Sequence, residues 1–158
     1  MKEVILITGS SRGIGAATAL LAARQGYAVC VNYVRDAQAA GALCARIVAD
    51  GGEAIAVQAD ASDEADVARL FGEIDARLGT LTALVNNVGV LEQKCRLVDM
   101  SAQRLERVLR TNVISYFLCC QQAVRRMSTA HGGQGGRIVN VSWAAARIGS
   151  PDEYTDYA

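Results

Sequence analysis

Three glycines follow the first apolar run of the chain at a spacing that suits a dinucleotide phosphate. The run Val4–Ile7 leads directly into Thr-Gly-Ser-Ser-Arg-Gly-Ile-Gly at 8–15, and an amphipathic pattern follows. Glycines allow the backbone to approach a pyrophosphate closely, and a helix N-terminus adds free N–H groups and partial positive charge. The spacing is G-x-x-x-G-x-G with no Lys-Ser/Thr pair, which excludes an ATP-binding P-loop. An ordinary strand-to-helix turn is the weaker alternative.

The end of the second apolar run indicates which dinucleotide would bind. NAD-dependent enzymes place a carboxylate there, on the ribose 2′-hydroxyl, but Asn32, Tyr33 and Val34 supply none. Arg12 lies in the glycine segment and Arg35 just after the run, and two guanidinium groups near one ribose suit a 2′-phosphate. Solvated surface arginines are the alternative. The missing carboxylate favours NADP(H).

Polar residues also follow the third and fourth apolar runs. Asp60 comes after the third run, where its carboxylate can accept from an adenine amino group; a turn or helix-capping aspartate is the alternative. Asn-Asn-Val-Gly at 86–89 follows the fourth run, on the rim where doubly wound folds bind ligands. Both segments therefore point to the same edge of a sheet as the glycine segment.

Asn112 is an amide within a long helical pattern that opens at Ser101 and runs to about Met127. It falls on the apolar side, and an unsatisfied buried amide costs about 1–3 kcal/mol. A functional role and a satisfied structural asparagine are both compatible with this position. The apolar side is listed as Leu105, Val108, Leu109, Val113, Tyr116, Phe117 and Cys120. Leu118 and Cys119 lie opposite and are expected to be available for a subunit contact.

These segments need alternating strands and helices to bring them together. Apolar periodicity and turn residues predict strands over 4–7, 28–33, 54–58, 81–86 and 137–142. Helices are predicted over 13–25, 37–50, 62–78, with Ser62 as the cap, and 101–127. Continuous apolar strands separated by long helices indicate an α/β fold, a doubly wound parallel sheet covered on both faces. We expect a single dinucleotide-binding domain over 1–158.

Composition excludes several other classes of protein. Sixteen basic residues balance sixteen acidic ones, so no nucleic acid or membrane partner is expected. No segment resembles a signal peptide or a bilayer span. The five cysteines form no CxxC pair, which favours reduced thiols and a cytoplasmic location. The only histidine, His131, lies among glycines, so no metal site is expected.

Together these segments resemble the classical short-chain dehydrogenase/reductase family, with a likeness to its NADP-dependent 3-oxoacyl-carrier-protein reductases and sugar dehydrogenases. The resemblance covers the whole chain and rests on 9–15, Asp60, 86–89, Asn112 and Tyr157. It implies a Rossmann sheet of order 3-2-1-4-5 and hydride transfer between NADP(H) and a small carbonyl or alcohol substrate. The cofactor-binding residues that it implies are Thr8, Gly9, Ser11, Arg12, Gly13, Ile14, Gly15, Asn32, Tyr33, Arg35, Asp60, Ala61, Asn87, Val88 and Gly89.

The resemblance also assigns catalytic roles to Tyr157, as general acid/base, and to Asn112, which in the family holds a water in a proton relay. The family's tyrosine is followed four residues later by a lysine, and the chain ends at Ala158. The family reads Asn-x-Ser-Ser after the fifth strand, whereas this chain has Trp143 at the second serine. Ser142 could substitute if the loop shifts by one residue. Val88 also replaces the alanine of the family's Asn-Asn-Ala-Gly.

These departures lead to three expectations. The chain is expected to be a truncated form that lacks the family's last strands and substrate lid, so that the fifth strand is an exposed apolar edge. Its activity as it stands is in doubt, and a non-catalytic NADP(H)-binding module is the alternative. At full length, the helix over 101–127 is expected to form a homo-oligomer contact, as its counterpart does in the family.

Overall fold

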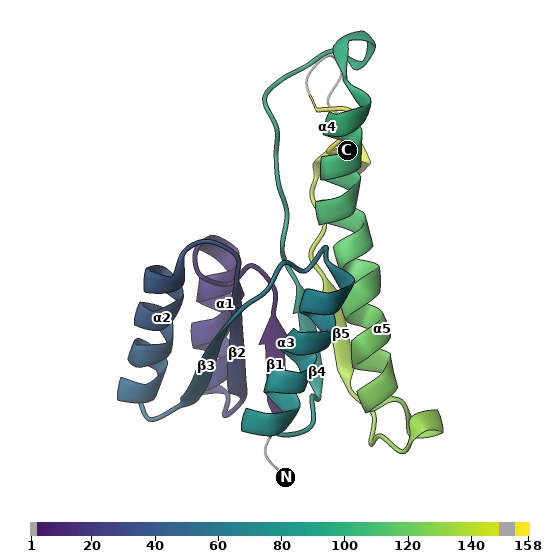
Figure 1. Ribbon diagram of the computed structural model, residues 1–158. Helices are drawn as coiled ribbons and strands as arrows, with labels where there is room; N and C mark the ends of the chain where they lie inside the picture. The colour runs from purple at the N-terminus through teal and green to yellow at the C-terminus, as the bar shows by residue number, and fades with distance from the viewer. Residues whose placement is uncertain (1–2, 149–153) are drawn as a thin grey trace.

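The computed structural model describes residues 3–148 and 154–158, and its described strands form one parallel sheet (Figure 1). The sheet order β3-β2-β1-β4-β5 confirms the predicted doubly wound topology. The register pairs Ile5 with Val29 on one side and with Ala83 on the other. The strands are β1 (Val4–Ile7), β2 (Ala28–Tyr33), β3 (Glu53–Gln58), β4 (Ala83–Asn86) and β5 (Arg137–Asn140).

Helices cover both faces of this sheet, and alternate residues of the same strands supply the two cores. Leu6 and Cys30 pack with α3 and α5 on one face, while Ile7 and Val31 pack with α1 and α2 on the other. This two-sided burial explains why the strands read as continuous apolar runs. The longer helices are α1 (Gly13–Arg24), α2 (Ala37–Ala49), α3 (Glu64–Arg77), α4 (Ala102–Leu109) and α5 (Ser115–Met127), and the short ones are η1 (Leu97–Asp99), η3 (Thr129–His131) and α6 (Ala145–Ile148).

Three of the long helices begin with a side-chain cap. Asp36 accepts from Ala39 N at 2.9 Å at the start of α2, and Ser101 accepts from Arg104 N at 3.2 Å at the start of α4. The prediction that Ser62 caps α3 is wrong, because Asp63 does so. The Ser62 hydroxyl instead donates to Asp60 Oδ1 at 2.7 Å, so it is already engaged outside the helix.

The long helix predicted over 101–127 forms, but a π-helical turn, η2 (Arg110–Ile114), separates α4 from α5. This turn rotates α5 relative to the pattern expected of an unbroken helix. The predicted burial of Leu109, Val113 and Phe117 is wrong, since they are 51%, 41% and 65% exposed. The turn accounts for Val113 and Phe117, whereas Leu109 precedes it. The expectation for Cys119 is also wrong: it is buried, on a stripe of mostly small residues that lets α5 lie close to the sheet.

The segment between β4 and α4 extends beyond the carboxyl ends of the strands, together with α4 itself (Figure 1). Residues 154–158 lie beside α4 in this projecting part. β5 is one of the two edge strands of the described sheet, and Val139 within it is 52% exposed, as expected for an apolar edge. None of the described helices is long and apolar enough to cross a membrane.

Candidate active site

The ends of β1 and β4 are fastened together by Thr8 and Asn87. The buried Thr8 hydroxyl accepts from the backbone N–H groups of Asn87 at 3.0 Å and Val88 at 3.2 Å. The Asn87 amide donates in return to the carbonyl oxygens of Thr8 at 3.0 Å and Gly9 at 3.2 Å. The glycine segment is therefore held rigidly against the residues that follow β4.

Two glycines are required by this close approach. A Cβ atom on Gly9 would lie 3.1 Å from Val88 Cα, and one on Gly15 would lie 2.7 Å from both the Asn87 amide nitrogen and Ser10 Cα. Gly13 has φ +59° and faces open space, with no atom within 4 Å of a Cβ built there. The segment thus leaves a free backbone surface at Gly13, as close binding of a pyrophosphate requires.

The N-terminus of α1 lacks the side-chain cap that α2, α3 and α4 have. Arg12 occupies the N-cap position without a side-chain hydrogen bond, and the first turn contains no acidic residue. Its N–H groups and partial positive charge are thus available to an anion such as a phosphate. Ile14 is 67% exposed beside them, and Ser11 is half-buried. These residues fit the dinucleotide that the glycine spacing implies.

Asn32 links three strand ends through its own side chain and backbone. Its Oδ1 accepts from Gly9 N at 3.1 Å, its amide nitrogen donates to Ala59 O at 2.9 Å, and its carbonyl accepts from Ser10 N at 2.9 Å. The side chain is almost fully buried. Asn32 therefore positions the glycine segment, and the adjacent Tyr33 packs half-buried against the core.

Arg12 and Arg35 are both exposed at this rim. The Ser10–Asn32 backbone bond joins the segments that carry them, since Ser10 precedes Arg12 by two residues and Asn32 precedes Arg35 by three. Within residues 3–148 and 154–158, neither guanidinium group is held in an ion pair. Both can turn toward a phosphate without breaking an existing interaction.

Asp60 follows β3 at the same rim with an exposed side chain. Its Oδ1 accepts from the backbone N–H of Ser62 at 2.9 Å as well as from the Ser62 hydroxyl. Asp60 therefore has the turn role that the sequence analysis gave as the alternative. Its carboxylate is exposed, so it remains accessible to an adenine. Ala61 is buried in the core beneath it.

Asn112 lies within the π-helical turn η2 and is paired with the segment after β4. Its Oδ1 accepts from Val90 N at 2.8 Å, and its amide nitrogen donates to Val90 O at 2.9 Å. The amide thus fixes the backbone one residue beyond Gly89. Insertions of this π type often mark functional sites.

Trp143 connects this segment to Tyr157. The indole lies against Gly89, where an added Cβ would come within 2.5 Å of the ring. On its other side the indole packs on the Tyr157 ring, with centroids 4.8 Å apart and planes inclined by 51°. Ser142 is exposed. Of these two residues, Trp143 is the one that contacts Tyr157.

The phenol groups near Trp143 are kept neutral by partial burial. Burial raises the pKa of Tyr157 above its ordinary value, because the charged phenolate loses water. Burial likewise raises the pKa of Tyr116 to about 12, and the Tyr116 hydroxyl donates to Val141 O at 3.1 Å. Tyr157 is accordingly a neutral phenol at neutral pH.

Known proteins match this chain along almost its whole length. The family model for short chain dehydrogenases matches residues 3–157. The chain belongs to the short-chain dehydrogenase family. An oxidoreductase of Escherichia coli K12, YgfF, is 52% identical over 155 residues, which are 98% of this chain and 63% of the relative. A 3-oxoacyl-[acyl-carrier-protein] reductase of Synechocystis is 37% identical over 151 residues, 96% of this chain and 60% of the relative.

A solved structure gives the same result. The short-chain dehydrogenase/reductase from Serratia marcescens superimposes with a TM-score of 0.90 at 31% identity, over 99% of this chain and 61% of that one. The chain thus spans about three fifths of the length of the curated relatives and the solved structure that it matches.

Two residues near the site of this short-chain dehydrogenase chain were missed by sequence reasoning. Arg104 of α4 and Asp156 form a bidentate ion pair directly beside Tyr157. They are separated by 52 residues, and no motif spacing links them. The sequence offered one signal for this pair: Asp156 is an acidic residue directly before Tyr157.

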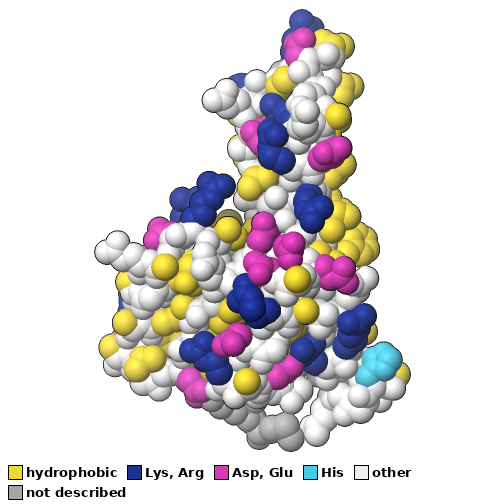
Figure 2. All heavy atoms as spheres, viewed as in Figure 1, with side chains coloured by type: hydrophobic (Ala, Val, Ile, Leu, Met, Phe, Trp, Pro, Cys, Tyr) yellow, Lys and Arg dark blue, Asp and Glu magenta, His cyan; other side chains and the backbone are white. Residues whose placement is uncertain are grey.

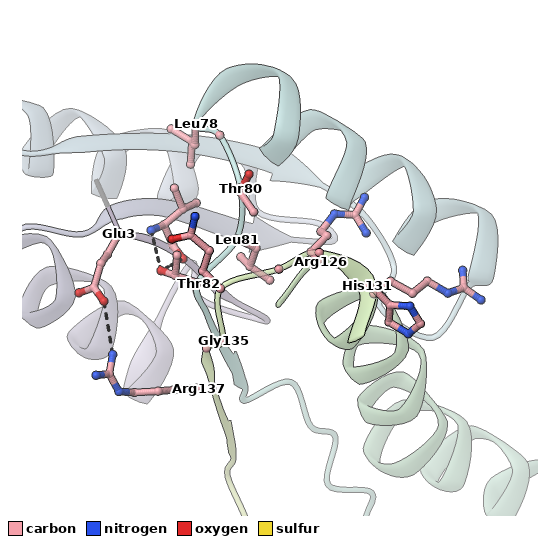
Figure 3. A pocket seen from close by; sticks show the side chains of 16 residues that line it. Glu3, Leu78, Thr80, Leu81, Thr82, Arg126, His131, Gly135 and Arg137 are labelled. Carbon is pink, nitrogen blue, oxygen red and sulfur yellow. Dashed lines mark hydrogen bonds and ion pairs between the residues drawn. The ribbon is translucent and has the colours of Figure 1, made fainter. Parts of the chain in front are cut away.

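A cavity of about 890 Å³ lies at the opposite end of the sheet (Figure 3). Val4, Thr82 and Arg137 line it, at the amino ends of β1, β4 and β5. The carboxyl ends, not these, bind ligands in doubly wound folds. Arg137 faces Glu3 there at 3.4 Å. This cavity is therefore separate from the short-chain dehydrogenase site.

Proposed function

We propose that the protein is an NADP(H)-dependent oxidoreductase that interconverts a small carbonyl compound and its alcohol. One observation carries this proposal: a continuous line of contacts joins the glycine segment to Tyr157. Gly9 lies against Val88, the next residue Gly89 lies against Trp143, and Trp143 lies against Tyr157. The carbonyl substrate would therefore lie where the phosphate-binding segment and the proton donor meet.

Each part of this line has a chemical task. Bound NADP(H) would supply or accept the hydride. The free N–H groups of α1 and the backbone at Gly13 would hold its pyrophosphate. As the carbonyl carbon gains the hydride, its oxygen takes the electron pair of the C=O bond, and the Tyr157 phenol donates the proton that completes the alcohol. Asn112 would hold the water that returns a proton to Tyr157.

A non-catalytic NADP(H)-binding module is the second candidate, and Trp143 favours it. An indole has a single N–H donor and fills the place where the family has a serine hydroxyl. A turnover assay separates the two candidates. We would use a hybrid protein, residues 1–158 followed by the C-terminal region of the Escherichia coli relative, with NADPH and a panel of ketones, keto esters and sugars. Turnover supports the enzyme, whereas tight NADPH binding without turnover supports the module.

The proposed cofactor preference gives a direct prediction for Arg35. The hybrid protein is expected to bind NADPH more tightly than NADH, and Arg35→Ala should weaken NADPH binding about 10- to 150-fold while changing NADH binding little. The reason is that a charge-assisted bond to the 2′-phosphate is worth about 1.5–3 kcal/mol, and NADH has no such phosphate. Dissociation constants measured by calorimetry at one salt concentration test this.

Arg46→Ala is the matched control, since Arg46 is an exposed arginine in the last turn of α2. It should leave both dissociation constants unchanged. Equal affinity of the unsubstituted protein for the two cofactors would exclude an NADP(H) preference. An equal loss for both cofactors on Arg35→Ala would show that Arg35 does not contact the 2′-phosphate.

We also propose that the outer face of α4 and α5 joins two copies of the protein. Leu109, Val113 and Phe117 follow at four-residue spacing, with Ile114 and Val124 beside them, and all are at least 41% exposed. Apolar side chains gather along this edge of the molecule (Figure 2). Such exposed apolar patches mark interaction sites, and a two-fold axis would pair this face with itself.

Phe117→Glu is expected to dissociate such an oligomer, because it places a carboxylate in the centre of an apolar contact. Light scattering of the hybrid protein at micromolar concentration should show the mass fall to that of a monomer. Leu21→Glu is the control, since Leu21 is 59% exposed on α1, and it should leave the mass unchanged. A monomeric mass of the unsubstituted hybrid would contradict the proposal.

A further inference from the structure

Arg104 is a nearly buried cation at the centre of three segments. Its Nε donates to Asp156 Oδ2 at 2.6 Å, its Nη2 to Asp156 Oδ1 at 3.2 Å, and its Nη1 to Gln93 O at 2.6 Å. The side chains of Arg104 and Asp156 are only 11% and 2% exposed. One guanidinium thus ties α4 to the segment after β4 and to residues 154–158.

Asp156 transmits this link directly to Tyr157. Its Oδ1 also accepts from the backbone N–H of Tyr157 at 3.0 Å. The Tyr157 N–H approaches the carbonyl of Tyr154 at 3.1 Å as well, so residues 154–158 form a tight turn around the carboxylate. Any movement of Asp156 would therefore move the Tyr157 ring.

The π-helical turn η2, which follows α4, fastens the other side of the site. Asn112, two turns further along, clamps the backbone of Val90, while Arg104 holds Gln93 in the same segment. Tyr157 and the segment after Gly89 are thus both bonded to the helical stretch formed by α4 and η2. Trp143 closes the arrangement because it touches both Gly89 and Tyr157.

We propose that Arg104 and Asp156 are positioning residues that hold the Tyr157 phenol in place at the candidate site, where its contact with Trp143 reports its position. The catalytic consequence rests on the proposed function, but the positioning itself can be tested without turnover. A carboxylate with 2% exposure cannot remain in place once its cation is removed. It must regain water, and the adjacent Tyr157 would then leave the indole.

Trp143 provides the probe, since it is the single tryptophan of the 158-residue chain. A tyrosinate absorbs where an indole emits, so ionisation of Tyr157 should quench the emission of Trp143. Within the described residues, charged or titratable groups near Tyr157 include Asp156, Arg104 on α4 and Tyr116 on α5. Tyr157→Phe identifies the part of the quenching that belongs to Tyr157.

In the unsubstituted chain, the quenching midpoint is expected above the ordinary phenol pKa of about 10, because Tyr157 is partly buried. Arg104→Gln should lower the midpoint to about 10, reduce the amplitude by about half or more as the rings separate, and shift the Trp143 emission to longer wavelength at pH 7. Asp156→Asn keeps the shape of the side chain and should give a smaller change. The double variant, with a neutral amide pair, should recover part of the original signal.

Arg107→Gln is the matched control. Arg107 lies three residues further along α4 and pairs with Glu92 of the same segment at 3.1 Å, but these side chains are 59% and 32% exposed, far more than Arg104 and Asp156. It should leave the midpoint, the amplitude and the emission wavelength unchanged. Circular dichroism identifies a variant that has unfolded. If Arg104→Gln unfolds, the fluorescence titration of Asp156→Asn tests the positioning role in its place.

In the hybrid protein, Arg104→Gln should lower kcat about tenfold and leave the KM for NADPH within about twofold, since a misplaced reacting group lowers the rate and not cofactor binding. If folded Arg104→Gln and Asp156→Asn both match Arg107→Gln in fluorescence, the positioning role is wrong, whatever the turnover. A shifted fluorescence titration in a hybrid without turnover would support positioning and contradict the proposed enzyme.

Discussion

Turnover of a ketone by the hybrid protein is expected to fall about 10²–10⁴-fold when Tyr157 is replaced by phenylalanine, which is the range that general acid–base catalysis contributes. The substitution removes only the hydroxyl and retains the ring that packs on Trp143. NADPH binding should be unchanged because the glycine segment is untouched. Steady-state oxidation of NADPH and a separate binding titration measure the two effects.

Tyr154→Phe is the control for this prediction, because Tyr154 lies in the same short segment with its ring 6.0 Å from the Lys94 ammonium. It should change kcat little. The pH profile adds a second criterion: carbonyl reduction requires the protonated phenol, so the rate should be constant at low pH and fall as the pH rises through the pKa of Tyr157. Comparable turnover by Tyr157→Phe, with the same pH profile, would assign the proton transfer to another group.

Most of the fold follows from local patterns in the sequence. β1 and β2 begin and end where the apolar runs predict, because both are central strands buried on both faces. β4 begins two residues later than predicted. Thr82, in the predicted part, uses its hydroxyl to bond Val4 N at 3.0 Å and Val4 O at 3.1 Å, so a side chain replaces part of the strand pairing.

The errors occur where two local solutions compete. Ser62 and Asp63 are both good helix caps, and the choice depends on Asp60, which accepts the Ser62 hydroxyl. The predicted burial of Phe117 is wrong because a π-helical turn precedes it. The spacing of apolar residues contains no signal for such an insertion, because this kind of pattern assumes the same rotation angle at every residue of the helix.

The candidate site likewise contains residues that the sequence could predict and residues that it could not. The glycine segment and the asparagines after β4 could be predicted because their chemistry depends on sequence neighbours. The sequence did not predict that Asn32 is buried and joins three strand ends, nor that Arg104 reaches Asp156. These contacts join residues 22 to 52 positions apart, and only the packed fold brings them together.

Trp143→Ser is expected to raise kcat of the hybrid protein by up to about 10²-fold. A hydrogen-bond donor directed at the developing oxyanion is typically worth about 10²–10³ in kcat, and the family places a serine hydroxyl at this position. The indole now fills the space between Gly89 and Tyr157. Its removal would admit the substrate oxygen to the Tyr157 hydroxyl while the new serine donates to the same oxygen.

Two control variants separate the effects of space and of the hydroxyl. Trp143→Ala opens the same space without a donor, so it should recover less of kcat than Trp143→Ser, although both should lower KM for the carbonyl substrate. Ser142→Ala should have little effect, because Ser142 is exposed and Trp143 is the residue that touches Tyr157. If Trp143→Ser leaves kcat unchanged while Ser142→Ala abolishes turnover, Ser142 is the working serine, and the loop after β5 acts one residue earlier than the family's pattern implies.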